Sequence, residues 1–191
     1  MNLPSRRPLF ALCLLAVWAS RLMAQAHTLP ISYLTVVPDK DYLHLELVLN
    51  PFELNFFSEI DTNHNHRLDP PELAGPGKDL TRRLVNCLVV RVDGKVVRAE
   101  TAGVVPDLDS HHITLRAHYR VDARRARVAI ESRLNAVTSG SHITQVRFGK
   151  PGHIQSAQLD LQSAAVTFKP FEPQTAVGPE GVVNSPRSSR R

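Results

Sequence analysis

Apolar and polar residues alternate along most of the chain with the two-residue period of β-strands that bury one face. The clearest run is 43–49, in which leucine occupies every second position. Strand-like runs lie at 31–37, 43–49, 88–92, 95–99, 113–121, 126–134, 142–148 and 158–168. Turn-forming residues separate them, and Asp93-Gly94 is typical of a tight hairpin that needs positive φ angles. The pattern predicts an antiparallel β-sandwich.

One segment, 50–86, interrupts this period. It opens with Asn50-Pro51-Phe52-Glu53, which has an N-cap residue, a proline at the first helical position and a glutamate at the third. Phenylalanine and isoleucine then recur at four-residue spacing up to Ile60, so a helix is predicted over 51–60. Helical character returns at 78–85. The expected fold class is therefore mainly β, an antiparallel β-sandwich with a short helical insertion between its second and third strands.

Between the two helical stretches, residues 61–72 read DTNHNHRLDPPE, with oxygen-bearing side chains at loop positions 1, 3, 5, 9 and 12. This spacing resembles the calcium-binding loop of EF-hand proteins, in which a curled chain turns oxygen atoms toward one Ca²⁺ ion. The resemblance implies a ligand set of Asp61, Asn63, Asn65, the backbone carbonyl of Arg67, Asp69 directly or through a water, and both carboxylate oxygens of Glu72. The expected cofactor is Ca²⁺, and the insertion is EF-hand-like.

The loop departs from the EF-hand pattern in two places. Position 6, normally glycine, is His66, and a positive φ there would cost about 1 kcal/mol. The exiting helix, which Asp69 would cap, is interrupted early by Ala74-Gly75-Pro76-Gly77. EF-hands normally pair, and no second loop in the sequence has the spacing. Leu68, the apolar residue expected beneath the loop, is therefore covered either by the β-domain or by a second copy of the chain.

The N-terminal segment 1–26 has the features of a secretory signal peptide. Arg6 and Arg7 precede an apolar run at 9–19, and Ala24-Gln25-Ala26 forms a small-residue cleavage site before His27. The arginine pair leaves general and twin-arginine export both open. The apolar run is too short to cross a bilayer as a helix, so the mature chain is expected to have no membrane span. The predictions are an exported protein, periplasmic or extracellular, with a domain at 27–173 and a disordered tail at 174–191.

Charge adds little to this picture, because the net charge of +5 comes from the two ends of the chain. The stretch between the signal segment and the tail has equal numbers of acidic and basic side chains. A nucleic-acid partner is therefore not expected. The sequence has no nucleophile elbow, zinc-protease helix or phosphate-binding glycine loop, so no enzyme is predicted, and a hydrolase of unfamiliar type is the remaining enzymatic alternative.

Two other functions stay open beside calcium binding. The α-amine and imidazole of His27 would chelate Cu²⁺ in a periplasmic copper-binding protein if a second histidine lay nearby. The candidates for that histidine are His111, His112, His118, His142 and His153. The alternative from another class is a protein-interaction module whose loop docks a partner. Cys87 is expected to be a buried small hydrophobic residue, without an intrachain disulfide in the mature protein.

The strand series also resembles a known family. LVVRVDGKVV at 88–97 and AQLDLQSAAVTF at 157–168 are similar to the exported soluble domain that precedes the membrane helices of some HupE/UreJ-type bacterial proteins of metal transport. The resemblance implies the fold and the exported, bacterial location. No membrane helices follow these strands in the sequence, so a transport role is not carried over.

Overall fold

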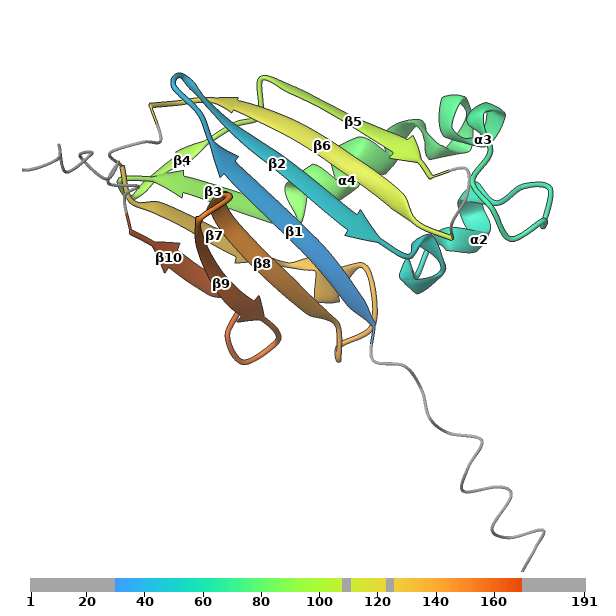
Figure 1. Ribbon diagram of the computed structural model, residues 1–191. Helices are drawn as coiled ribbons and strands as arrows, with labels where there is room; N and C mark the ends of the chain where they lie inside the picture. The colour runs from blue at the N-terminus through green and yellow to red at the C-terminus, as the bar shows by residue number, and fades with distance from the viewer. Residues whose placement is uncertain (1–29, 108–110, 123–125, 170–191) are drawn as a thin grey trace, which may run out of the picture.

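The computed structural model describes residues 30–107, 111–122 and 126–169. The signal segment 1–26, His27 and the tail 174–191 that the sequence predicts lie outside these residues. The described chain is mainly β and forms two sheets (Figure 1). The predicted β-sandwich with a short helical insertion is confirmed.

The larger sheet has six strands in the order β5-β6-β2-β1-β8-β9. Their bounds are β1 Ile31–Pro38, β2 Tyr42–Leu49, β5 Thr101–Pro106, β6 Ile113–Arg120, β8 Ile143–Lys150 and β9 His153–Leu159. The smaller sheet has the order β10-β7-β3-β4. Its strands are β3 Leu88–Val92, β4 Lys95–Val97, β7 Val128–Ser132 and β10 Ala165–Phe168. Figure 1 shows the larger sheet in front of the smaller one.

The core lies between the sheets, and β2 shows why the sequence folds this way. The leucines of this strand are at most 2% exposed, whereas His44 and Glu46 between them are half-buried on the opposite face. Each buried leucine contributes about 2 kcal/mol relative to an exposed one. A shift of register by one residue would turn all of these leucines to solvent, so the alternation fixes the register.

Three details of the sheets differ from the prediction. β1 pairs with β8 in parallel, so the larger sheet is mixed. The run 158–168 is not one strand, because Asp160 accepts hydrogen bonds from the N–H groups of Gln162 and Ser163 and turns the chain from β9 to β10 in the other sheet. β5 was not predicted, because its sequence TAGVVP lacks alternation. Asp93 and Gly94 have the positive φ angles expected of their hairpin.

The helical insertion joins β2 to β3; α2, α3 and the loop between them lie at one end of the sandwich, and α4 runs back from that end behind β6 (Figure 1). Its elements are the 3₁₀ turns η1 Pro51–Glu53 and η2 Pro76–Asp79 and the helices α2 Phe57–Ile60, α3 Pro70–Ala74 and α4 Leu80–Asn86. A further 3₁₀ turn, η3 Leu134–Ala136, follows β7. The single helix predicted over 51–60 is wrong, because Leu54 is extended and the Asn55 N–H donates to the Val137 carbonyl at 2.9 Å. The helical character predicted at 78–85 is confirmed.

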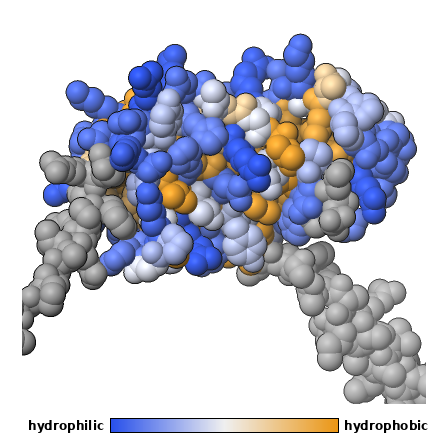
Figure 2. Space-filling model, turned by 45° about the horizontal axis from the view of Figure 1, so that its top comes forward, coloured by the Kyte–Doolittle hydropathy of each residue, from blue (hydrophilic) through white to orange (hydrophobic). Residues whose placement is uncertain are grey.

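The surface is mixed in character. The face in Figure 2 is mostly hydrophilic, with apolar residues interspersed. The large apolar side chains that are exposed, among them Tyr33, Val96 and Leu161, come from different parts of the described chain. Within 30–107, 111–122 and 126–169, no helix is both long and apolar enough to cross a membrane.

Candidate metal site

The loop 61–72 connects α2 to α3, in the position that the EF-hand resemblance predicts. α2 ends at Ile60, and Asp61 is its C-cap residue. Asp69 is the N-cap of α3 and has an extended backbone, with proline following it. Pro70 and Pro71 lack N–H groups and fit the start of a helix, so both ends of the loop follow from local sequence. α3 ends at Ala74, as the Gly-Pro-Gly sequence after it predicts.

Asp61 closes the first half of the loop. Its side chain is buried, with the residue only 2% exposed. One carboxylate oxygen accepts the Asn65 N–H and the other accepts the His66 N–H, each at 3.1 Å. These hydrogen bonds curl the backbone around the carboxylate at loop position 1.

The curl requires left-handed backbone at loop position 6. His66 has φ +60°, as the sequence predicts for the position that is normally glycine. His64 also has a positive φ, +57°, which was not predicted. Side-chain oxygens of the two asparagines support the turn, because Asn63 accepts the Asn65 N–H at 2.9 Å and Asn65 accepts the Arg67 N–H at 2.8 Å. Asparagine tolerates such turns through this local hydrogen bonding.

Asp69 draws the two asparagine side chains together. Its Oδ2 atom accepts hydrogen bonds from the side-chain amides of Asn63 at 3.2 Å and Asn65 at 2.8 Å. Loop positions 3, 5 and 9 therefore meet around one carboxylate oxygen. In this arrangement the amide nitrogens, not the amide oxygens, face Asp69.

Glu72 fastens the end of the loop to its beginning. The residue is 4% exposed. Its Oε1 accepts the Thr62 N–H at 2.8 Å, the Thr62 hydroxyl at 3.2 Å and the Asn63 N–H at 3.2 Å, while Oε2 accepts the Asp69 N–H at 3.0 Å. Burial raises the pKa of this carboxyl, but the hydrogen bonds from Asp69, Asn63 and Thr62 outweigh it, so the net pKa is lowered. Glu72 is therefore held as a carboxylate.

The predicted ligands are thus neighbours in one loop, connected by hydrogen bonds. Within the described residues, no group of three or more histidine, cysteine, aspartate or glutamate side chains is arranged to hold a metal ion. Asp61 and Glu72 each accept backbone N–H groups of other loop residues. The residue types fit a hard cation such as Ca²⁺, because the set offers three carboxylates and two amides.

Leu68 at loop position 8 is only 6% exposed and belongs to the hydrophobic core. With Pro51, Pro106 and Ile113 it lines a small hollow of about 60 Å³ beside the loop. The sequence leaves open whether the β-domain or a second copy of the chain covers Leu68. The structure shows that the β-domain of the same chain covers it. The expected packing of Leu68 beneath the loop is confirmed.

The candidate copper ligands lie in several places. His118 contacts His44 on the larger sheet, and His142 is buried at 2% exposure. His111 lies beside Phe52, with ring centroids 5.8 Å apart. His112 lines the hollow next to the loop, and His153 begins β9. His27, on which the copper hypothesis depends, lies outside the described residues.

Sequence reasoning missed a chain of polar side chains in the interior. His142 Nε2 lies 3.0 Å from the Ser32 hydroxyl, and His142 Nδ1 lies 3.2 Å from a Glu53 carboxylate oxygen. Ser32, Thr144 and Ser132 continue the chain through their hydroxyl groups. The order glutamate, histidine, serine is that of a hydrolase triad, but Ser32 is completely buried, so its hydroxyl is closed to a substrate in this structure. Single residues that lie far apart in sequence form no motif that would reveal such a chain.

The sequence matches no protein-family model and no curated protein. The resemblances to EF-hand and HupE/UreJ-type proteins therefore stay predictions from the sequence.

Proposed function

We propose that this chain is an exported β-sandwich protein that binds Ca²⁺ through the loop 61–72. The observation that carries the proposal is the coincidence of ligand spacing with a curled backbone whose sixth position, His66, has φ +60°. A polar surface turn does not require a left-handed residue there, whereas an EF-hand loop does. Asp61 and Glu72 also support it, because they place buried carboxylates at loop positions 1 and 12, where an EF-hand loop binds the ion.

Binding requires a local change in which the loop exchanges its own donors for the ion. Glu72 leaves the N–H groups of Thr62 and Asn63 and turns toward the centre of the loop. The amides of Asn63 and Asn65, which now donate to Asp69, present their oxygens instead. In this structure the N–H donors stabilise the carboxylates of the loop, and the positive charge of Ca²⁺ would take over that role.

This exchange sets the expected affinity. Ca²⁺ competes with hydrogen bonds that already satisfy the carboxylates, and the left-handed His66 remains strained, so the dissociation constant is expected on the order of 10⁻⁴ M. That range suits an exported protein, because external calcium is millimolar. The ion would stabilise the insertion by joining its two arms and would perform no chemistry.

A thermal melt of the full chain with CaCl₂, MgCl₂ or chelator tests the proposal. At calcium concentrations well above the dissociation constant, the melting temperature rises, because an ion that binds only the folded state stabilises it by about 2.7 kcal/mol at a hundredfold excess. Mg²⁺ gives a smaller rise, because it prefers a rigid octahedral site with several waters.

Glu72→Gln removes one charged ligand while keeping the size of the side chain, so it abolishes the rise with calcium. Glu59→Gln is the matched control, because Glu59 is an exposed acid on α2 just before the loop and pairs only distantly with Arg83, at 3.7 Å. The control keeps the full calcium response. An equal response in both variants, or no response to millimolar calcium in the unaltered protein, would overturn the proposal.

A further inference from the structure

Two histidines face each other on the outer surface of the larger sheet. His44 on β2 and His118 on β6 are register partners in the antiparallel ladder. Their Nδ1 atoms lie 2.6 Å apart, and the ring centroids lie 4.8 Å apart with planes at 80°. The short distance between the nitrogens, compared with that between the rings, means that each Nδ1 points at the other ring. One Nδ1–H donates this hydrogen bond and the other Nδ1 accepts it, and the tautomers of the two rings decide which is which.

The surroundings hold this geometry. The ring of Tyr42 stacks on His44, with centroids 6.0 Å apart. Val37 of β1 is the register partner of His44, and Thr101 of β5 is that of His118, so strands flank the pair on both sides. Both imidazoles are half-buried and are oriented by their strands, because residues on one face of a ladder have fixed neighbours.

The pair opens onto a hollow of about 430 Å³ on the sheet surface, lined by Thr35, Leu45, Glu46 and Arg116 together with the histidines. Glu46 lies two residues from His44 on the same face and binds Arg116 at 3.0 Å. The carboxylate offsets the charge of the arginine beside the pair. The hollow leaves room for water molecules and for Glu46 to approach.

We infer that His44 and His118 form a binding site for a divalent transition-metal ion of the Zn²⁺ or Cu²⁺ class, with Nδ1 of each ring as a ligand. Neutral imidazole nitrogen suits these ions and not Ca²⁺. The metal takes the place of the proton between the rings. The imidazole that donates changes tautomer, because its Nδ1 gives up its proton to solvent and its Nε2 takes one up, so both rings stay neutral. Two bonds of about 2.1 Å at a tetrahedral angle need the nitrogens about 3.4 Å apart, so modest side-chain rotations suffice.

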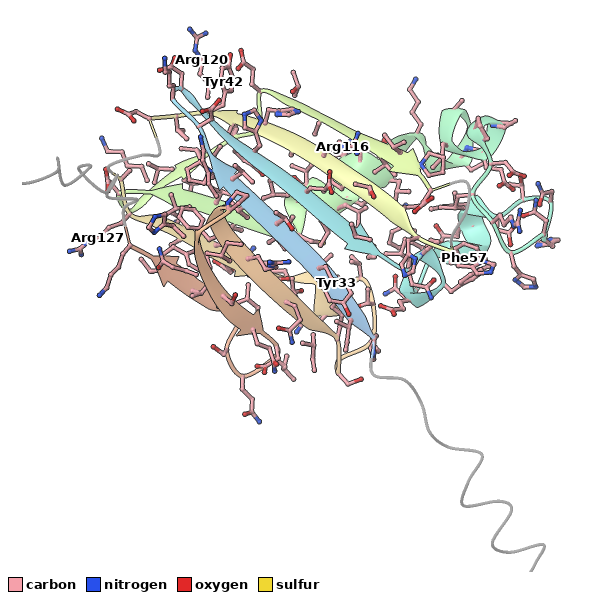
Figure 3. The ribbon with its side chains drawn as sticks, in the orientation of Figure 1. Tyr33, Tyr42, Phe57, Arg116, Arg120 and Arg127 are labelled. Atoms are coloured by element: carbon pink, nitrogen blue, oxygen red, sulfur yellow. The ribbon has the colours of Figure 1, made fainter. Side chains whose placement is uncertain are left out.

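The site has two protein ligands, and water or Glu46 completes the coordination. This agrees with the finding that the described residues hold no preformed group of three acidic, histidine or cysteine ligands. The pair lies toward the start of β2, whereas the loop 61–72 follows the other end of that strand (Figure 1). Figure 3 shows the same separation, with Tyr42 and Phe57 at opposite ends of the sheet. The inference is therefore independent of calcium binding.

Titration of the ¹⁵N-labelled full chain with ZnCl₂ in excess CaCl₂ tests the site. In imidazole ¹⁵N spectra, the Nδ1 resonances of His44 and His118 shift together and saturate at one equivalent. His44→Gln and His118→Gln each weaken this Zn²⁺ binding at least about tenfold, because either change leaves a single imidazole ligand. Far-UV circular dichroism of each variant checks that the fold is kept.

His111→Gln is the matched control, because His111 is an exposed histidine near Phe52 on another part of the surface. This variant keeps the affinity and the paired shift. Zn²⁺ binding that moves other histidine resonances and leaves Nδ1 of His44 and His118 unchanged would overturn the inference. Unchanged affinity in both pair variants would do the same, whatever the outcome of the calcium experiment.

Discussion

Individual residues of the loop show where sequence spacing is informative and where it is not. Spacing identified the side chains that line the loop, and Asn63, Asn65 and Asp69 do contact one another. It did not reveal that Glu72 accepts the N–H groups of Thr62 and Asn63. The carboxylate at position 12 can reach either these N–H groups or an ion bound in the loop. The spacing of the residues is the same in both cases, so it does not distinguish them.

The left-handed backbone of His66 gives a test at the scale of one residue. Its φ of +60° favours glycine, because a Cβ atom is crowded there. His66→Gly and His66→Ala both remove the imidazole and its contact with Phe52 at 6.0 Å. The glycine variant is expected to be more stable than the alanine variant by about 1 kcal/mol, the reverse of the usual order. Urea unfolding at one pH measures the difference.

The same comparison at Arg82 provides the control. This residue lies within α4, where right-handed backbone makes alanine the more stable choice by about 1 kcal/mol. If alanine is as stable as glycine at position 66, the loop does not have its EF-hand curl.

Among the elements, the short helices and 3₁₀ turns of the insertion are stabilised by close packing against one another rather than by their length. A Cβ atom on Gly77 would lie 2.9 Å from the Glu72 carbonyl oxygen and 3.1 Å from Cγ2 of Ile60. Gly77 is buried at the start of η2 and so touches the residues at both ends of the loop. Arg83 of α4 adds to this packing by lying 4.5 Å over the ring of Phe56. The two arms are thus held together at a point with no room for a side chain.

Gly77→Ala is therefore expected to destabilise the protein by about 1–3 kcal/mol, because overpacking displaces backbone that cannot move freely. The variant should also weaken any calcium response by moving Glu72. Gly140→Ala is the matched control, because a Cβ atom there meets nothing within 4 Å. Chemical denaturation measures both, and equal stabilities would show that η2 is not packed against the loop.

Elements were predictable where one face of a strand is buried and less so elsewhere. β2 and β6 follow the alternation along their full length, because solvent lies on one side and the core on the other. The helix predicted over 51–60 failed because of one distant backbone partner, Val137. The parallel pairing of β1 with β8 joins segments more than a hundred residues apart, and no local pattern specifies such a pairing.

At the scale of the whole molecule, the chain of buried polar side chains connects the insertion with both sheets. Glu53 belongs to the insertion, Ser32 and Thr144 to the larger sheet, and Ser132 to the smaller one. His142 joins the insertion to the sheets. Nδ1 of His142 and Oε2 of Glu53 lie 3.2 Å apart but lack hydrogen-bond geometry, so the contact becomes an ion pair only when His142 is protonated.

The titration of these two groups gives the fold a pH dependence whose sign follows from burial. Burial lowers the pKa of His142 from 6.5 to about 4, so the unfolded chain takes up this proton first as the pH falls, and stability is lost between pH 6.5 and 4. The full shift corresponds to about 3 kcal/mol. Burial raises the pKa of Glu53, which acts in the opposite sense, because the folded protein holds that proton more tightly and regains part of the loss.

The free energy of unfolding, measured by urea denaturation at pH 7 and pH 5, is therefore expected to fall by about 1–2 kcal/mol on acidification. His142→Gln removes most of this fall, because glutamine retains a polar partner for Ser32 but does not titrate. Glu53→Gln makes the fall steeper, because it removes both the compensating proton and the carboxylate that favours an imidazolium. The lowered pKa of Glu72 affects stability only below its usual range and leaves this comparison unchanged. Identical pH slopes in all three proteins would show that the link between insertion and sheets does not depend on ionisation.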